Sequence, residues 1–245
     1  MGKAFLAAGI AVLAAVGAAP VARATLLQNG SFEQLNLAAT PINASGFVTL
    51  HPGQTSLTGW AVSGNTVDVV PGTYWQASNG NWSVDLTGTP GVGALTQVVA
   101  TSAGTTYKLT FDLSSNPENL TDEATLAKKL RVSMESAGNV LLNQVDFSTY
   151  TGTRTKSNMM YVKETLYFTA NSTATAISLA SMAPAGASAS GVYTGPVIDN
   201  LDLEPFSSNV PPPSSDPPAV PEPASMALLG IGAAACLMRR GREVR

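Results

Sequence analysis

The middle of the chain alternates between apolar and polar side chains. From Tyr107 to Leu113 every second residue is apolar, and Lys108, Thr110 and Asp112 lie between them. A period of two predicts a β-strand with one buried face. Similar short segments, bounded by Gly, Pro, Asn or Ser, recur at 67–70, 82–86, 95–100, 130–135, 140–147, 161–170, 174–181 and 197–203. The pattern predicts an all-β domain over residues 25–206, an antiparallel β-sandwich or jelly roll.

One segment of this region has helical character. Residues 121–129 (Thr-Asp-Glu-Ala-Thr-Leu-Ala-Lys-Lys) predict a single short helical insertion. Strands do not alternate with helices elsewhere, which argues against a Rossmann fold or an α/β barrel.

The first 24 residues have the pattern of a secretory signal peptide. Lys3 provides the positive start, residues 4–19 form an apolar run, and Ala22 and Ala24 match the small-x-small cleavage pattern. We expect signal peptidase to cut after Ala24, so that the exported chain begins at Thr25, outside the cytoplasm. A retained membrane anchor is the alternative, but the run is short and rich in Ala and Gly for a stable span.

The C-terminal end has three segments in order. Residues 207–220 are rich in Ser and Pro, which predicts an extended linker. The tripeptide Pro221-Glu222-Pro223 follows, and residues 224–238 are all apolar or small. As a helix they would span about 22 Å, less than the hydrocarbon core of about 30 Å. Arg239 and Arg240 come next, and the positive-inside rule keeps this end cytoplasmic.

This order resembles the PEP-CTERM sorting signals of Gram-negative bacteria. Residues 221–245 would supply the PEP motif, a short transmembrane helix and the Arg-rich tail. The resemblance implies recognition by exosortase, a membrane-embedded cysteine transpeptidase, with transient anchoring in the inner membrane and removal of the tail. The protein would then reach the cell envelope, the cell surface or the extracellular matrix. A plain single-pass anchor is the alternative.

Composition and charge exclude several classes of function. Charged residues make up 12% of the chain, with 13 basic and 16 acidic residues and a net charge of −3. An ordinary domain has about 25%, so the chain lacks the dense basic charge of a nucleic-acid-binding protein. One His and one Cys cannot build a His- or Cys-based zinc site. The region 25–206 contains no Cys, so its stability depends on an apolar core and not on disulfides.

A series of motifs extends the fold prediction to a family. The motifs are Asn29-Gly30-Ser31-Phe32-Glu33, Gly59-Trp60, Val67-Asp68-Val69-Val70, Ser83-Val84-Asp85-Leu86-Thr87-Gly88, Leu95-Thr96-Gln97, the run from Gly104 to Leu113, and Ile198-Asp199-Asn200-Leu201. In this order they resemble the bacterial choice-of-anchor C family, which is related to a domain of unknown function in plant cell-wall proteins. The resemblance implies a galactose-binding-like jelly roll of the carbohydrate-binding-module type. Residues 116–129 match none of its motifs.

The same resemblance implies a structural calcium ion. In related sugar-binding jelly rolls, an acidic residue of the opening segment and one of the closing segment hold the ion. The residues at these places are Glu33 and Asp199. First and last strands are neighbours in such folds, and calcium binds carboxylate and carbonyl oxygens. The alternative is that both are turn or edge residues with local hydrogen bonds.

Clustered aromatic residues are the candidates for glycan contacts. Sugar rings pack their apolar faces on aromatic planes, and their hydroxyls need amides or carboxylates nearby. Tyr74, Trp75 and Trp82 supply the rings, and Gln76 supplies an amide. For Tyr74 and Trp75 exposure and burial are equally compatible with the sequence, whereas Trp60 is interpreted as a core residue.

Three classes of function follow. The favoured hypothesis is a non-catalytic module that binds extracellular polysaccharide, with a neutral glycan preferred because the exported region is acidic, with 7 basic and 13 acidic residues. The second is a purely structural protein of the envelope or biofilm matrix. The third and least favoured is a glycoside hydrolase, in which Asp68 and Asp85 would flank the scissile bond. Exposed positions on polar strand faces explain these two aspartates at least as well, so no catalytic residue is predicted.

Overall fold

The computed structural model describes residues 25–118, 128–149, 154–182 and 194–207. Its contacts divide the chain into two units, Met1–Phe206 and Ser207–Arg245. The predicted signal peptide, linker, PEP motif and C-terminal helix lie outside the described residues, apart from Ser207. So does most of the predicted helix 121–129, of which Lys129 proves to be the first residue of a strand. Among the described residues, no helix is long and apolar enough to cross a membrane.

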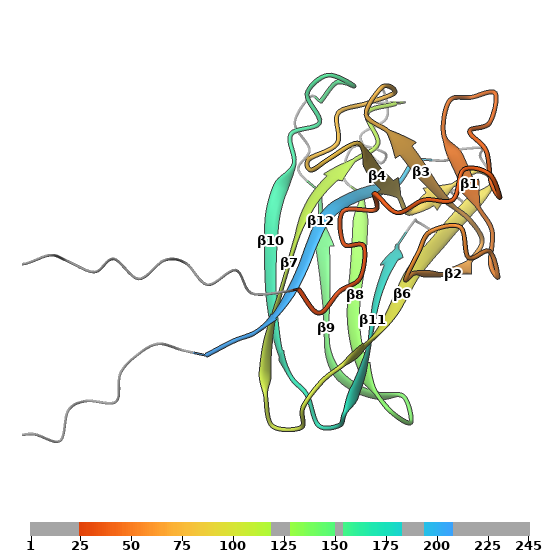
Figure 1. Cartoon of the computed structure of the whole chain (residues 1–245). Coiled ribbons are helices and arrows are strands. Elements are labelled where there is room, and N and C mark those ends of the chain that lie inside the picture. Colours follow the sequence, from red (N-terminus) through yellow and green to blue (C-terminus); the bar gives the residue numbers. More distant parts are fainter. Residues whose placement is uncertain (1–24, 119–127, 150–153, 183–193, 208–245) are drawn as a thin grey trace, which may run out of the picture. The chain divides into compact units, whose positions relative to one another are not determined.

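Two antiparallel sheets pack face to face and confirm the all-β sandwich (Figure 1). The strands are β1 (Val48–Leu50), β2 (Ala61–Gly64), β3 (Val67–Pro71), β4 (Trp82–Asp85), β5 (Thr87–Gly88), β6 (Gly91–Ala100), β7 (Thr106–Ser115), β8 (Lys129–Ser136), β9 (Val140–Ser148), β10 (Val162–Thr169), β11 (Ala174–Ser181) and β12 (Pro196–Pro205). The first sheet has the order β1-β3-β4-β12-β7-β10. The second has the order β2-β6-β11-β8-β9, with β5 paired to β6.

Side chains from both sheets meet in one core. On β7, Tyr107, Leu109, Phe111 and Leu113 are all buried, as the alternation predicts. Phe111 packs edge-on against Phe147 of β9 with 5.2 Å between ring centroids, a contact that joins the two sheets. Burial of apolar surface of this kind is the main source of stability for a domain without disulfides.

The predicted strands are all present, and the structure adds β1, β2 and β5. These three strands have 3, 4 and 2 residues, which is too short for a period of two to show in the sequence. Trp60 is buried in the core, as predicted, and its Nε1 donates to the carbonyl oxygen of Asn29 at 3.0 Å.

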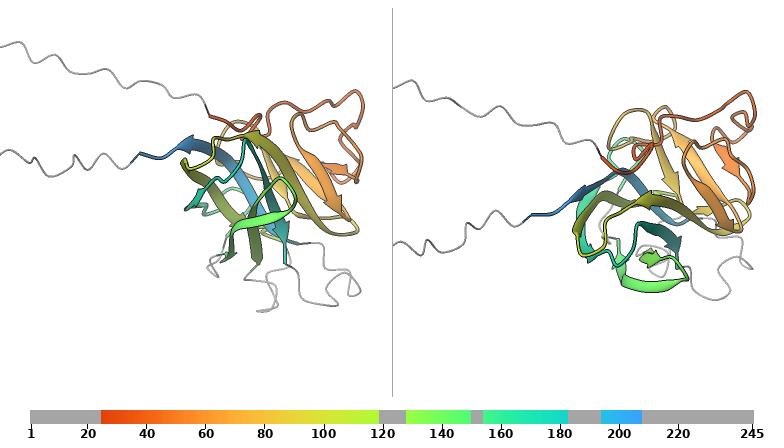
Figure 2. Two further views of the ribbon diagram at one scale, coloured as in Figure 1. Left: turned by 90° about the horizontal axis from the view of Figure 1, so that it is seen from below. Right: turned by 60° about the horizontal axis from the view of Figure 1, so that its bottom comes forward.

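The sandwich has two different ends. The hairpin turns that join β6 to β7, β8 to β9 and β10 to β11 lie at one end, whereas the longer loops that precede β4 and β10 gather at the other (Figure 1). Both layers can be followed from other directions in Figure 2. The loop end therefore brings together segments that are far apart in the sequence.

The opening and closing segments of the domain lie side by side. The backbone N–H of Leu201 donates to the carbonyl oxygen of Gly30 at 2.9 Å. Asn200 has a φ of 54°, and the register of β12 against β7 shifts between Asp199 and Asp202. This bulge turns the closing segment toward the opening one, as the resemblance implies.

Candidate functional site

A pocket of about 240 Å³ lies at the loop end of the sandwich. One side is aromatic. The ring of Tyr74 contacts the rings of Phe47 and Trp75 edge-on, with centroid distances of 5.8 and 5.5 Å. Trp75 is only 3% exposed, and its Nε1 donates to Ser83 Oγ at 2.8 Å. Tyr74 and Phe47 are half-buried, so a ligand can reach their rings more easily than that of Trp75.

Two aspartates form another side of the pocket. Asp68 on β3 and Asp85 on β4 are directly opposite each other in the antiparallel register. They are 5% and 1% exposed, so the expectation that they occupy exposed strand positions is wrong. The sequence suggests exposure because both follow polar–apolar alternation, but β3 is buried on both faces. Residues from other segments, among them Thr49, Thr89 and Asn116, contact the two carboxyl groups on the face that the pattern predicts to be polar.

Hydrogen bonds hold both carboxylates in place. Thr49 Oγ1 donates to Asp68 Oδ1 at 2.7 Å, and the N–H of Thr89 donates to Oδ2 at 3.2 Å. Asp85 accepts from the N–H of Thr87 and from Asn116 Nδ2, each at 2.8 Å. Each carboxylate therefore uses part of its acceptor capacity within the fold.

Burial dominates the protonation of this pair. It raises the pKa of Asp68 to about 6, although the hydrogen bonds from Thr49 and Thr89 oppose the shift. It raises the pKa of Asp85 to about 7, and the nearby charge of Asp68 raises it further. Two carboxyl groups in one pocket with pKa values near neutrality are a feature of functional sites more than of structural ion pairs.

A threonine hydroxyl in the same pocket lacks a partner. Thr194 is 7% exposed, and among the residues that the structure describes its Oγ1 has no hydrogen-bond partner. A buried hydroxyl without a partner is costly. It marks a place where a ligand atom can complete a hydrogen bond.

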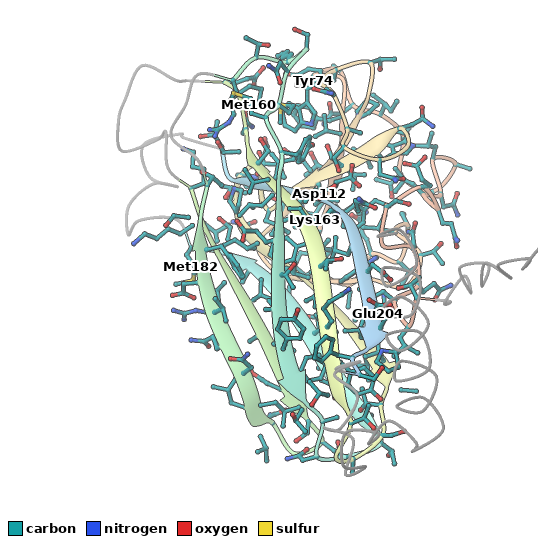
Figure 3. The ribbon with its side chains drawn as sticks, turned by 90° about the vertical axis from the view of Figure 1, so that its left-hand side faces the viewer. Tyr74, Asp112, Met160, Lys163, Met182 and Glu204 are labelled. Atoms are coloured by element: carbon teal, nitrogen blue, oxygen red, sulfur yellow. The ribbon has the colours of Figure 1, made fainter. Side chains whose placement is uncertain are left out.

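An ion pair stands at the rim. Tyr74 donates its hydroxyl to Glu118 Oε1 at 2.7 Å, and Lys156 Nζ lies 2.8 Å from the same oxygen. The ammonium also lies 3.7 Å from the centroid of the Tyr74 ring. Burial opposes the ionisation of Glu118, but the hydrogen bonds from Lys156 and Tyr74 outweigh it and lower the pKa. Figure 3 shows Tyr74 at the loop end, above the ion pair of Asp112 with Lys163.

The two predicted calcium ligands both hold one loop. Glu33 Oε1 accepts from the N–H groups of Asn81 and Trp82 at 2.7 and 3.0 Å. Asp199 Oδ2 accepts from the N–H groups of Ser78 and Asn79, each at 2.8 Å. Asp199 thus binds the beginning of the 78–82 segment and Glu33 binds its end.

Hydrogen bonds give both carboxylates a structural role that needs no calcium ion. Both carboxylates are directed at N–H donors, and the described residues include no group of three His, Cys, Asp or Glu that could hold a metal. Burial raises the pKa of Asp199 to about 7 despite the N–H donors. Calcium binding by Glu33 and Asp199 stays a prediction.

We expect Glu33→Ala to lower the free energy of unfolding by about 1–3 kcal/mol, since hydrogen bonds to a charged acceptor are lost. A chelator should lower the melting temperature of the unsubstituted protein if Glu33 and Asp199 share a calcium ion, and leave it unchanged if they only hold the loop. Thermal unfolding with and without EDTA measures both. A melting temperature that EDTA lowers in the unsubstituted protein but not in Glu33→Ala would instead establish a shared calcium ion.

The predicted glycan contacts separate into two groups. Tyr74 and Trp75 line the pocket. Gln76 and Trp82 do not: the Gln76 side chain accepts from the N–H of Met159 at 3.2 Å, and Trp82 packs against the main core. The sequence reasoning also missed lining residues that come from separate loops, namely Phe47, Thr89, Asn116, Glu118 and Thr194. Asn116 and Glu118 belong to the stretch without a family motif, and the sequence offers no signal for them.

The fold and pocket define a β-sandwich module with a ligand-sized site at one end. The chain belongs to the family described as "Protein of unknown function (DUF642)", which matches residues 25–204. This confirms the resemblance to the family of unknown function, while membership of the choice-of-anchor C family stays a prediction. A second match, the PEP-CTERM protein-sorting motif, covers residues 219–242 and indicates an exported, envelope-directed protein.

Individual relatives are more distant. Halomucin of Haloquadratum walsbyi (strain DSM 16790 / HBSQ001) is 37% identical over 108 residues, which is 44% of this chain and 1% of halomucin. Among solved structures, TmCBM61 in complex with beta-1,4-galactotriose is 16% identical over 75% of this chain and 100% of that one, with a TM-score of 0.46. A family 35 carbohydrate binding module from Clostridium thermocellum is 13% identical, with 65% and 98% covered and a TM-score of 0.37. Likenesses of this size say nothing about a ligand.

Proposed function

We propose that this protein is an exported, non-catalytic carbohydrate-binding protein of the cell surface or extracellular matrix, and that its pocket binds one sugar unit of an extracellular polysaccharide. The supporting observation is the combination of a reachable aromatic ring, Tyr74, with carboxyl, amide and hydroxyl groups in one small pocket. A sugar ring needs an apolar plane on one side and hydrogen-bonding groups around its edge. The pocket provides both.

The volume favours a single sugar unit. Pockets for drug-sized ligands have volumes of about 300–1,000 Å³, and this one has about 240 Å³. A ligand of one ring fits such a pocket, whereas a groove along several rings would be larger.

The PEP-CTERM match supports processing on export. In this proposal signal peptidase removes residues 1–24, and the segment 224–238 holds the chain in the inner membrane for a time. Exosortase then cuts near Pro221-Glu222-Pro223 and releases the domain to the biofilm matrix or cell surface.

A glycoside hydrolase is the second candidate, because Asp68 and Asp85 are neighbours with raised pKa values. Catalysis requires a carboxyl proton within about 2.6–3.2 Å of the glycosidic oxygen. Asp85 is 1% exposed and accepts hydrogen bonds from Thr87 and Asn116. Because Asp85 is buried and its carboxyl group is fixed by these hydrogen bonds, it is better suited to bind a ligand group than to transfer a proton to a glycosidic oxygen.

We expect Tyr74→Ala to lower the affinity for polysaccharide about tenfold, which corresponds to about 1.4 kcal/mol. Tyr167→Ala is the matched control, because Tyr167 is 45% exposed on β10 and does not line the pocket. The purified protein is titrated calorimetrically with polysaccharide extracted from bacterial matrix, and the products are checked for new reducing ends. If both variants lose the same affinity for polysaccharide, the pocket is not the binding site. Turnover that Asp68→Asn abolishes would favour the hydrolase.

A further inference from the structure

The pocket carries an excess of negative charge. Three of its lining residues are acidic, namely Asp68, Asp85 and Glu118, and none is Lys, Arg or His. Glu118 is neutralised by Lys156 at the rim. Burial raises the pKa of both aspartates, while the nearby His51 opposes the shift of Asp68 and Asp68 adds to the shift of Asp85. The inner part of the pocket therefore has two carboxyl groups and no cation among its lining residues.

The hydrogen-bonding groups that remain free in the pocket can all accept a hydrogen bond. A carboxylate has about four acceptor positions. Asp68 accepts from the Thr49 hydroxyl and from Thr89, and Asp85 accepts from Thr87, Asn116 and, at 3.4 Å, the N–H of Gly195. Each carboxylate keeps a position for a further donor. The Thr194 hydroxyl, buried in the same pocket without a described partner, can also accept, although it can donate as well.

Such a set fits a ligand group with several donors and a positive charge. A primary ammonium has three donors and no acceptor. A sugar hydroxyl has one donor and no charge, and a carboxylate of an acidic sugar would be repelled. A cation would also offset the desolvation of the two buried carboxyl groups, which otherwise remain unpaired.

Building on the proposed carbohydrate function, we propose that the pocket binds the protonated amino group of an amino sugar without its acetyl group, with Asp68, Asp85 and Thr194 as acceptors and Tyr74 against the sugar ring. The burial that raises the pKa of both aspartates has a consequence for binding. The free protein retains protons at the pair near neutral pH, and the ammonium must displace them. Affinity therefore falls as the pH is lowered from 7 to 5.

The test compares three sugars that differ at carbon 2. Glucosamine, N-acetylglucosamine and glucose are titrated calorimetrically into the purified protein at pH 7 and pH 5, with butylamine as an ammonium without a ring. We expect glucosamine to bind at least about tenfold more tightly than the two neutral sugars at pH 7, and to lose this advantage at pH 5. Butylamine should bind more weakly than glucosamine, because it cannot cover the Tyr74 ring.

Asp68→Asn removes the charge and retains the fold. An asparagine amide can donate to the Thr49 hydroxyl and accept from the N–H of Thr89, so both present partners stay satisfied. We expect this variant to lose the preference for glucosamine. The control is Asp146→Asn, because Asp146 pairs with Arg131 on the exposed face of β8 and β9. Melting curves of both variants verify the fold.

The outcomes separate this inference from the proposed function. Neutral sugars that bind as tightly as glucosamine, with Asp68→Asn unchanged, would overturn the ammonium site and leave the carbohydrate function intact. Butylamine that matches glucosamine would also overturn the amino-sugar inference, in favour of a general amine site. If no sugar, amine or polysaccharide binds, both proposals fail together.

Discussion

Replacing Gly30 by alanine is expected to lower the free energy of unfolding by about 3 kcal/mol, the upper part of the range for overpacking. A Cβ atom at this position would lie well inside van der Waals contact of the Leu201 carbonyl oxygen and 3.0 Å from its carbonyl carbon. Both are backbone atoms of β12, which pairs with β4 on one side and β7 on the other. The strand cannot move away without losing ladder hydrogen bonds. The contact cannot relax by rotation of a side chain either.

Gly53→Ala is the matched control for this substitution. Gly53 has a φ of 85°, but a Cβ there meets nothing within 4 Å. This variant has only the backbone strain of a left-handed conformation, about 1 kcal/mol. Urea unfolding of both variants measures the difference. If the two lose equal stability, the close approach to Leu201 does not restrict position 30 to glycine.

The second large effect is on pH dependence: the protein is expected to be more stable at pH 5 than at pH 8 by a few kcal/mol. Burial raises the pKa of Asp68 to about 6 and the pKa values of Asp85 and Asp199 to about 7. The folded state therefore binds protons that the unfolded chain has already released. This stability is fully present below the unfolded pKa of 3.8. It is lost as the pH rises through 6 and 7.

Other acids do not cancel the trend. Burial opposes the ionisation of Asp112, but hydrogen bonds from Asn200, Lys163 and Ser78 lower its pKa below the ordinary value. Asp112 therefore favours folding above pH 4 and contributes no change between pH 5 and 8. This contribution of Asp112 is lost when the carboxyl group becomes protonated in stronger acid. The free energy of unfolding should therefore also decrease as the pH is lowered below 3.8, the unfolded pKa of aspartate.

Urea unfolding at pH 5, 6, 7 and 8 measures the slope, and Asp68→Asn should make it shallower because one raised pKa is removed. Asp146→Asn should leave the slope unchanged, since Asp146 is exposed beside Arg131. If the free energy of unfolding instead rises from pH 5 to pH 8, these carboxyl groups are ionised in the folded protein throughout this range. A bound cation, for example, would stabilise the ionised form.

Most of the fold was predictable, and the physical reason is local. The alternation of Tyr107, Leu109, Phe111 and Leu113 with polar residues requires one buried strand face, and the structure has it. The side-by-side placement of the opening and closing segments was also expected, from the resemblance of their motifs. What the motifs could not show is the target of Glu33 and Asp199. Both carboxylates bind backbone N–H groups of one loop.

The candidate pocket was predictable only in part. Tyr74 and Trp75 are found in it, but Gln76 and Trp82, which are close in sequence, point to other partners. Asp68 and Asp85 follow strand patterns that suggest exposure, and the loops that bury them come from distant parts of the chain. Burial by such loops depends on tertiary contacts and leaves no period in the sequence.

The sequence by itself therefore determined the all-β sandwich, the PEP-CTERM sorting motif and a mildly acidic domain without Cys, because alternation, segment order and composition are local properties of a chain. The tertiary structure alone decided that Asp68, Asp85, the ring of Tyr74 and the Thr194 hydroxyl, which has no partner among the described residues, share a pocket of about 240 Å³. Desolvation in that pocket, which no single segment causes, raises the pKa of both aspartates toward neutrality.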